Sequence, residues 1–255
     1  RPQTTNKWQN SEIEGIDIML AIDVSTSMLA EDLKPNRLEA AKDVAAEFIN
    51  GRPNDNIGIT LFAGETFTQC PLTVDHAVLL DMIHNIKCGL ITDGTAVGMG
   101  IANAVTRLKD SKAKSKVIIL LTDGTNNKGD ISPMTAAEIA KSFGIRVYTI
   151  GVGTNGMAPY PYPVGNTVQY VSMPVEIDEK TLTEIAGTTD GNYFRATSNS
   201  KLKEVYEEID KLEKTKLNVK EYSKRDEEYH WFALAAFLCV LLEVLLRNSV
   251  LKKIP

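Results

Sequence analysis

The sequence contains few of the side chains on which redox sites, zinc sites and most nucleophilic enzymes depend. It has three cysteines and three histidines in 255 residues. Cys70, Cys88 and Cys239 are too widely spaced for a C-x-x-C metal or redox motif, and an odd number of cysteines does not form a disulfide framework. Unpaired thiols are the simpler interpretation, but a bridge between Cys70 and Cys88 stays open if the domain faces an oxidising compartment.

The sequence also lacks the basic excess that nucleic-acid binding requires. Its formal net charge is -5, and no block of Lys and Arg occurs in the first two hundred residues. Because contacts to phosphate groups depend on such positive patches, we expect no nucleic-acid partner. With 43% hydrophobic residues, the chain has enough apolar side chains for a sizeable globular core.

A long apolar run occurs once, from Trp231 to Leu246, with Glu243 as its single charge. A helix of these sixteen residues rises about 24 Å, less than the roughly 30 Å of a hydrocarbon core, but flanking aromatic and basic side chains extend its reach. We predict a transmembrane helix in contact with lipid at 230–248, after a charged linker at 215–229 and before a short basic tail at 249–255. An interfacial or buried helix is the alternative, favoured by the shortness and by Glu243.

The start of the sequence shows no leader peptide. Residues 1–14 form a polar lead-in that begins with Arg and has no apolar stretch before Trp8. We therefore expect the sequence to be a fragment or a processed chain.

Strands and helices alternate over residues 15–214, which we predict to form one domain. The predicted strands are continuous apolar runs, as is typical of a parallel sheet that helices cover on both faces. The pattern predicts an α/β fold with a doubly wound, mostly parallel sheet. We expect strands at 16–23, 57–63, 65–70 (a short edge strand), 116–122, 145–151 and 191–196, and helices at 36–50, 74–87, 96–109, 133–143, 179–186 and 200–214.

End signals mark several of these helices. Thr73 and Asp178 are predicted N-caps, and Ser132 with Pro133 forms a predicted pair of N-cap and first helical residue. Gly51 is a predicted C′ residue. In contrast, residues 154–176 are rich in proline and tyrosine and interrupt the alternation, so we expect a functional or mobile insertion there.

Polar side chains gather where ligands bind in open α/β sheets, beyond the carboxyl ends of the strands. Asp23, Ser25 and Ser27 follow the first predicted strand, Thr95 precedes the third predicted helix, and Asp123 follows a later strand. All five offer oxygen atoms, which suit hard divalent cations such as Mg²⁺, with Mn²⁺ or Ca²⁺ as alternatives, whereas zinc prefers nitrogen and sulfur ligands. A helix cap with turn serines would explain the first three residues but not their convergence with the other two.

Hydroxyl-rich ligation has a consequence for binding. If the hydroxyls of Ser25, Ser27 and Thr95 contact the cation and Asp23 and Asp123 act largely through water, the cation is only partly neutralised and keeps an open position. Such a cation attracts an external carboxylate. We therefore expect a partner protein that supplies a Glu or Asp to the metal.

The same residues resemble von Willebrand factor A domains with a metal-ion-dependent adhesion site. D-x-S-x-S at 23–27, the Thr of DGT at 95 and the Asp of LLTDG at 123 all match that pattern. The resemblance implies that Ser25, Ser27 and Thr95 bind the metal directly and that Asp23 and Asp123 bind it directly or through water.

More narrowly, the sequence resembles the Bat (aerotolerance) branch of bacterial membrane-anchored members, in RPQ at 1–3, PNRLEAAK, DGTAVG, LLTDGTNNKGDISP and the closing apolar run. This resemblance implies a domain on the outer side of the bacterial inner membrane. It also implies association with other Bat-type proteins and a MoxR-type AAA+ ATPase, in protein assembly or protection under envelope or oxidative stress.

Three other functions compete with metal-dependent binding. A hydrolase would need a base for Ser25 or Ser27, but His76 and His84 lie in a predicted helix and the G-x-S-x-G elbow is missing. A dinucleotide enzyme would need a helix after GVGTNG at 151–156, which the following prolines forbid. A structural scaffold, in which the metal only joins the loops, stays open.

Overall fold

The computed structural model describes residues 15–154, 156–164 and 167–219, together with short helical stretches at 233–234, 237–240 and 243–244. By its internal contacts the chain divides into a unit of residues 13–217 and a second unit made of residues 1–12 and 218–255. The first unit contains the central sheet and all five candidate metal ligands.

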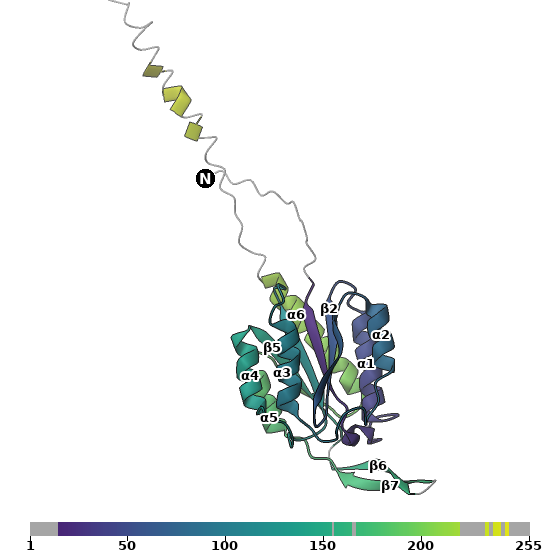
Figure 1. Ribbon diagram of the computed structural model, residues 1–255. Helices are drawn as coiled ribbons and strands as arrows, with labels where there is room; N and C mark the ends of the chain where they lie inside the picture. Colours follow the sequence, from purple (N-terminus) through teal and green to yellow (C-terminus); the bar gives the residue numbers. More distant parts are fainter. Residues whose placement is uncertain are drawn as a thin grey trace, which may run out of the picture. The chain divides into compact units, whose positions relative to one another are not determined.

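A six-stranded sheet forms the centre of this unit (Figure 1), in the spatial order β3-β2-β1-β4-β5-β8. Every neighbouring pair is parallel except β2 and β3. The chain runs outward from β1 in both directions, so β1 and β4 flank the switch point where the connections diverge. The doubly wound, mostly parallel sheet predicted from the sequence is confirmed. Its strands are β1 (Asp17–Asp23), β2 (Asn56–Phe62), β3 (Thr66–Thr73), β4 (Lys116–Thr122), β5 (Ile145–Val152) and β8 (Tyr193–Ala196).

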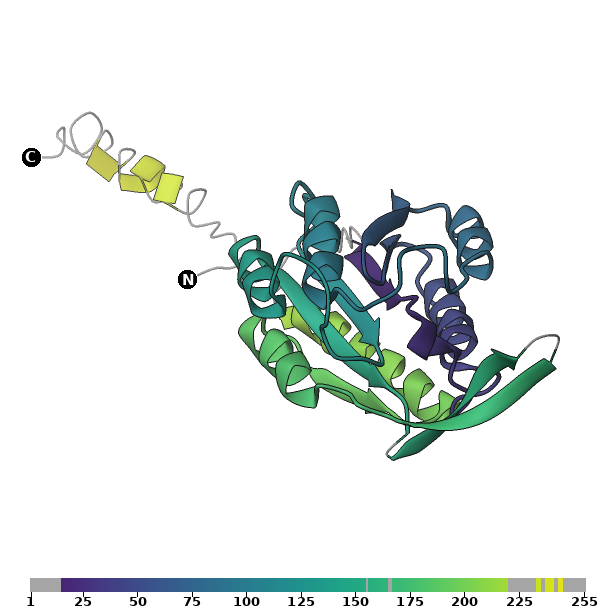
Figure 2. The same ribbon diagram turned by 60° about the horizontal axis from the view of Figure 1, so that its bottom comes forward.

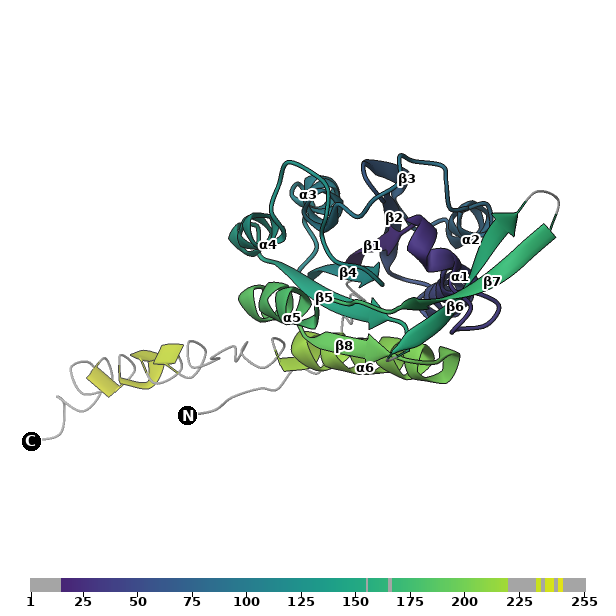
Figure 3. The same cartoon turned by 90° about the horizontal axis from the view of Figure 1, so that it is seen from below.

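Helices cover both faces of the sheet, as Figure 3 shows from the carboxyl ends of the strands. Successive residues of β1 point to opposite faces, so Leu20 and Ile22 enter one core cluster while Met19 and Ala21 enter another. The first cluster includes residues of α1 (Arg37–Asn50), α2 (His76–His84) and α6 (Asn199–Val219), and the second includes residues of α3 (Val97–Leu108), α4 (Pro133–Ser142) and α5 (Glu179–Thr188). Burial of both faces explains why the strands read as continuous apolar runs.

The helix ends agree with the sequence in part. The side chains of Ser132 and Asp178 cap α4 and α5 as predicted. The N-cap predicted at Thr73 is wrong, because Asp75 caps α2 by accepting from Val78 N. Thr73 instead accepts from Asp75 N, which adds a turn before the helix. Gly51 follows α1 with φ -77, so the helix ends there without the left-handed backbone expected of a C′ glycine.

The proline-rich insertion folds as a β-hairpin of β6 (Met157–Val164) and β7 (Thr167–Pro174), where the sequence predicted no strand. Val175 N donates to Gly156 O at 2.8 Å, so Gly156 and Val175 form a hydrogen-bonded pair of the antiparallel ladder. Even-numbered residues of β6 therefore turn their N–H groups toward β7, and the odd-numbered positions face away. The prolines of β6 occupy odd positions only, so they cost the hairpin no hydrogen bond.

The carboxyl-terminal part of the chain differs from expectation at one point. Helix α6 continues to Val219, so the first residues of the linker predicted at 215–229 are helical. The transmembrane helix predicted at 230–248 falls largely outside the described residues and stays a prediction. Within the residues that are described, no helix has the length and apolar character needed to cross a membrane.

Candidate metal centre

The candidate centre lies at the carboxyl end of the sheet, between the two central strands. The register pairs Ile22 of β1 with Leu121 of β4, so Asp23 ends one strand while Asp123 directly follows the other. Both carboxylates are buried, with 0% and 3% of their residue surface exposed. The divergence of the connections at this switch point therefore places two acidic side chains side by side under the loops.

Asp23 is held by hydrogen bonds to both of its carboxylate oxygens. Its Oδ1 accepts from Ser25 N at 2.9 Å, and its Oδ2 accepts from Thr122 Oγ1 at 2.6 Å. Burial raises the pKa of Asp23 from 3.8 to about 7, and the charge of Asp123 acts in the same direction, while these hydrogen bonds oppose the shift. The negative charge at this position is thus costly without a cation.

The serines of D-x-S-x-S connect this strand end to the next one. A short 3₁₀ helix, η1 (Thr26–Leu29), turns the chain so that Ser25 Oγ and Ser27 Oγ lie 3.0 Å apart. Ser27 Oγ donates to Asp123 Oδ1 at 2.7 Å. Burial raises the pKa of Asp123 as well, although its hydrogen bonds oppose this shift. The two hydroxyls and the second carboxylate therefore form one continuous set of oxygen atoms.

Thr95 reaches the same place from the loop before α3. It is buried, its N–H donates to Asn127 Oδ1 at 2.9 Å, and its carbonyl accepts from Asn127 N at 3.0 Å. A Cβ placed on Gly124 would lie 3.3 Å from Thr95 Oγ1, so the hydroxyl rests against the residue after Asp123. The five side chains predicted from the sequence thus converge on one end of the sheet.

The donor set fits a hard divalent cation. Among the described residues, no group of three or more His, Cys, Asp or Glu side chains is arranged to hold a metal, so a nitrogen- or sulfur-rich centre is not found there. The converging side chains instead provide hydroxyls and two buried carboxylates that raise each other's cost of ionisation. A cation between them would replace that repulsion by attraction to both.

Arg37 is a part of the site that the sequence analysis did not single out. Its Nη1 donates to Asp123 Oδ2 at 2.6 Å, and its Nε and Nη2 donate to the two carboxylate oxygens of Asp32 at 2.7 and 2.6 Å. Its side chain is 4% exposed. One feature of the sequence could have indicated that Arg37 has an acidic partner. It is the first residue of α1, where the helix dipole disfavours a cation unless a carboxylate compensates.

Two further residues fix the loops around the serines. Asp93 accepts from Thr26 N at 3.0 Å and from Thr26 Oγ1 at 2.8 Å, which ties η1 to the loop that carries Thr95. Cys88 Sγ donates to Ser25 O at 3.4 Å. Burial raises the pKa of Cys88 to about 12, and nearby carboxylates add to the shift, so this thiol stays protonated and is a poor nucleophile. All three cysteines are free, so the bridge left open by the sequence does not form.

The histidines of α2 are not placed to act as bases for a serine nucleophile. His76 Nε2 lies 3.0 Å from Asp55 O, and His84 Nδ1 lies 2.6 Å from Leu80 O in its own helix. In the described part of the chain, neither histidine has a contact with Ser25 or Ser27. The glycine run at 151–156 leads into β6 rather than a helix, so it cannot present a helix N-terminus to a pyrophosphate.

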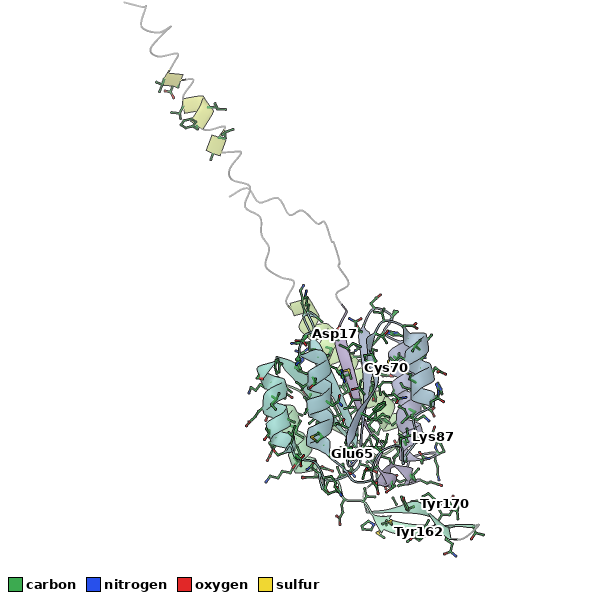
Figure 4. All side chains as sticks on the ribbon, in the orientation of Figure 1. Asp17, Glu65, Cys70, Lys87, Tyr162 and Tyr170 are labelled. Carbon is green, nitrogen blue, oxygen red and sulfur yellow. The ribbon has the colours of Figure 1, made fainter. Side chains whose placement is uncertain are left out.

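The β6–β7 hairpin lies at the same end of the sheet as η1 in Figures 1 and 2. Tyr162 and Tyr170 mark it in Figure 4, at the opposite end from Asp17 at the start of β1. Glu31 N donates to Pro159 O at 2.9 Å, so the hairpin is joined to the loop that follows η1. The segment that interrupts the α/β alternation is therefore a neighbour of the candidate centre.

Comparison with known proteins agrees with this fold. The sequence model of the family described as von Willebrand factor type A domain matches residues 17–208. The conserved hypothetical protein BatB from Bacteroides thetaiotaomicron is 34% identical, with a TM-score of 0.69 over 78% of this chain and 100% of that chain. An aerotolerance-related membrane protein from Bacteroides fragilis is also 34% identical, with a TM-score of 0.67 over 77% of this chain and 100% of that chain.

Longer relatives extend beyond the chain. An uncharacterized protein of Borreliella burgdorferi is 28% identical over 255 residues, which cover 99% of this chain and 75% of that protein. The chain spans 58% of the length of two Mycolicibacterium paratuberculosis relatives, at 32% and 33% identity.

Proposed function

The chain belongs to the von Willebrand factor type A domain family, and from this membership we propose that it binds a partner protein through a divalent cation. Asp23, Ser25, Ser27, Thr95 and Asp123 would hold the cation, and a Glu or Asp of the partner would complete its coordination. Mg²⁺ is the proposed ion, with Mn²⁺ or Ca²⁺ as substitutes, because the donors are all oxygen atoms.

One observation carries this proposal: the hydroxyls converge beside two carboxylates whose four oxygens each already accept a hydrogen bond, so each carboxylate oxygen has one acceptor site fewer for a cation. Asp23 accepts a hydrogen bond on each oxygen, and Asp123 accepts from Ser27 and from Arg37. This arrangement favours neutral hydroxyl oxygens as direct ligands, with the carboxylates acting through water. A cation ligated in this way keeps most of its charge and attracts an external carboxylate.

The same geometry argues against catalysis. A cation held mainly by hydroxyls activates a bound water only weakly. A zinc-type centre, which has several protein ligands and keeps one position for water, activates it more strongly. A serine nucleophile would need a base, and the histidines of α2 are bound to backbone carbonyls instead. We propose a binding protein rather than an enzyme, with a metal-joined scaffold as the second candidate and a hydrolase as a weaker third.

The broader role is proposed from similarity to the Bacteroides proteins, one of them described as an aerotolerance-related membrane protein. We propose a protein of the bacterial inner membrane whose domain at 15–214 lies on the outer side, after a lead-in at 1–14. A linker at 215–229, a transmembrane helix at 230–248 and a basic tail at 249–255 would follow. Other Bat-type proteins and a MoxR-type AAA+ ATPase are the proposed partners in envelope assembly or stress protection.

Metal-dependent capture tests the binding function. We expect the tagged full chain, purified from membranes, to retain a specific partner with Mg²⁺ and to lose it with EDTA. Asp23→Ala and Thr95→Ala should lose the partner even with Mg²⁺, whereas Thr106→Ala, at an exposed position on α3, should retain it. Capture that is unaffected by EDTA would contradict the proposal. A large metal-dependent rise in Tm without any partner would support the scaffold, and ester turnover lost in Ser25→Ala would support the hydrolase.

A labelling test of the membrane orientation requires an introduced cysteine. Cys70 is buried and the raised pKa of Cys88 suppresses its thiolate, so the native cysteines of the domain are unsuitable. Val74→Cys places a thiol at a position that is 65% exposed. The proposed orientation predicts labelling by an impermeant maleimide on intact spheroplasts, and labelling only after lysis would refute it.

A further inference from the structure

The β6–β7 hairpin and η1 enclose a groove that opens beside the candidate metal centre. Its volume is about 270 Å³. Pairing in the hairpin places Ala158, Tyr160 and Tyr162 on the same face as Met173. The groove is lined by this face together with Thr26, Ser27, Ala30, Arg37, Pro174 and Val175. Ser27 belongs to both the groove and the metal centre, so the two are continuous.

Among the described residues, the lining is mostly apolar or aromatic and contains no acidic side chain. Arg37 is the one charged residue among them, and that guanidinium is already paired with Asp32 and Asp123. Tyr162 is 57% exposed and Met173 is 48% exposed, so both present uncovered surface. A carboxylate at the metal would therefore meet no repulsion from the groove, and the residue beside it would meet apolar surface.

The base of the hairpin is fixed to the metal centre by a chain of hydrogen bonds. Asp32, which Arg37 holds, accepts from Thr154 N at 2.8 Å and from Thr154 Oγ1 at 3.1 Å. Arg195 donates to Gly153 O and Thr154 O at 3.2 and 3.0 Å. Gly153 has φ +140, and a Cβ there would lie 2.8 Å from Arg37 Nη2, so only glycine lets the chain pass this close. The groove is thus held in place before a ligand arrives.

The prolines determine how a partner can be recognised here. The backbone nitrogens of Pro159, Pro161 and Pro163 face away from β7 and carry no hydrogen. The outer edge of β6 therefore lacks three N–H donors. The carbonyl of Pro159 is occupied by Glu31 N. A partner segment cannot extend the hairpin as a regular strand along this edge. Recognition in the groove therefore depends on side chains.

We propose that this groove selects the residue next to the partner's metal-binding carboxylate and takes an aromatic or long aliphatic side chain there. The inference rests on the proposed metal-dependent binding and adds the sequence preference of the partner: an acidic residue with a large apolar neighbour in an extended segment. Tyr162 and Met173 are its specificity-determining residues, and neither of them ligates the cation.

A defined peptide library tests the preference. The probe is a set of acetylated, amidated hexapeptides with one fixed Glu and one varied position on either side of it, and binding to the full 255-residue chain in detergent is measured with Mn²⁺ and with EDTA. We expect Phe, Tyr, Leu or Met beside Glu to bind at least fivefold more tightly than Ser, only with Mn²⁺. Tyr162→Ser and Met173→Ser should remove this preference while their calorimetric affinity for Mn²⁺ stays that of the wild type.

Controls come from the opposite face of the hairpin. Val168→Ser, at a position that is 59% exposed and outside the groove lining, should keep the preference. With diamagnetic Mg²⁺ in place of Mn²⁺, the methyl NMR signal of Met173 should shift on adding the best peptide, while that of Met157 on the other face should not. Metal-dependent peptide binding without a neighbour preference, or a preference that survives both groove variants, overturns this inference alone. Absence of metal-dependent binding by every peptide overturns the proposed function with it.

Discussion

Arg37 joins a candidate metal ligand to the hairpin beside it: Nη1 donates to Asp123 Oδ2 at 2.6 Å, while Nε and Nη2 hold Asp32. Asp32 in turn accepts from Thr154 at the start of the hairpin. The metal centre and the groove therefore share one buried ion-pair network. We expect a substitution at one end of this network to alter the structure at the other end.

Loss of Arg37 should destabilise the protein most when metal is absent. Arg37→Ala leaves Asp32 and Asp123 buried without their counter-ion, which typically costs about 3 to 5 kcal/mol. Saturating Mg²⁺ should recover part of this loss because the cation compensates the charge of Asp123. Urea unfolding with EDTA and with Mg²⁺ measures both values. An equal loss in the two conditions would show that Asp123 does not face the cation.

Removal of the charge of Asp32 should loosen the hairpin. In Asp32→Asn, the bonds to Thr154 and Arg37 weaken, so amide hydrogen exchange at Tyr160 and Tyr162, whose N–H groups face β7, should accelerate at least tenfold. Asp178→Asn, which alters an N-cap on α5, is the matched control and should leave these amides unchanged. Unaltered exchange in Asp32→Asn would mean that the hairpin is held by its other contacts.

Thr95 should be required for metal affinity but not for the fold. Its side chain makes no capping bond for α3, and its backbone contacts to Asn127 remain in Thr95→Ala. We expect the Mg²⁺ affinity to fall at least tenfold by calorimetry, since loss even of a supporting partner of a ligand costs about that much. Thr106→Ala should match the wild type. Wild-type affinity in Thr95→Ala would remove this hydroxyl from the site.

Glu213, at the end of the sheet opposite the metal centre, should make the stability of the protein depend on pH. It accepts from Tyr148 Oη at 2.5 Å and from Ser115 Oγ at 2.8 Å, and it pairs with Arg146. Burial acts to raise the pKa of Glu213, but the hydrogen bonds from Arg146, Tyr148 and Ser115 outweigh it, so the pKa lies below its ordinary 4.5. The stability from this depressed pKa is present above pH 4.5 and is lost as pH falls through the folded-state value.

The variant Glu213→Gln checks this sign. It should lower the free energy of unfolding by about 3 kcal/mol near neutral pH, because Arg146 loses its buried counter-ion. The difference from the wild type should shrink as pH falls below 4.5. Glu204→Gln, in a surface pair with Lys201, should leave the pH profile unchanged. A difference that stays constant at low pH would contradict the assignment.

The fold and the five candidate ligands could be predicted because both leave local patterns. Apolar runs with intervening amphipathic segments specify a covered parallel sheet, and strand ends near the switch point make Asp23 and Asp123 neighbours although they are far apart in the chain. Arg37 and Asp93 were missed because their partners lie across the fold, at Asp123 and Thr26. Long-range pairs of this kind have no sequence period.

The hairpin was missed for a different reason. Proline disfavours strands on average, and the cost vanishes only when every proline falls on an outward position of a two-stranded ribbon. Pro159, Pro161 and Pro163 meet that condition, but the register that decides it is set by the pairing of Gly156 with Val175. The alternation of proline with tyrosine and valine was the available signal.

The most direct test of the proposed metal centre is an anomalous difference map from crystals of the full chain grown with Mn²⁺. We expect a single strong peak at the carboxyl ends of β1 and β4, within about 2.4 Å of the hydroxyls of Ser25, Ser27 and Thr95, with Asp23 and Asp123 bonded largely through water. A map without a peak there, or a cation held by other residues, would contradict the central claim.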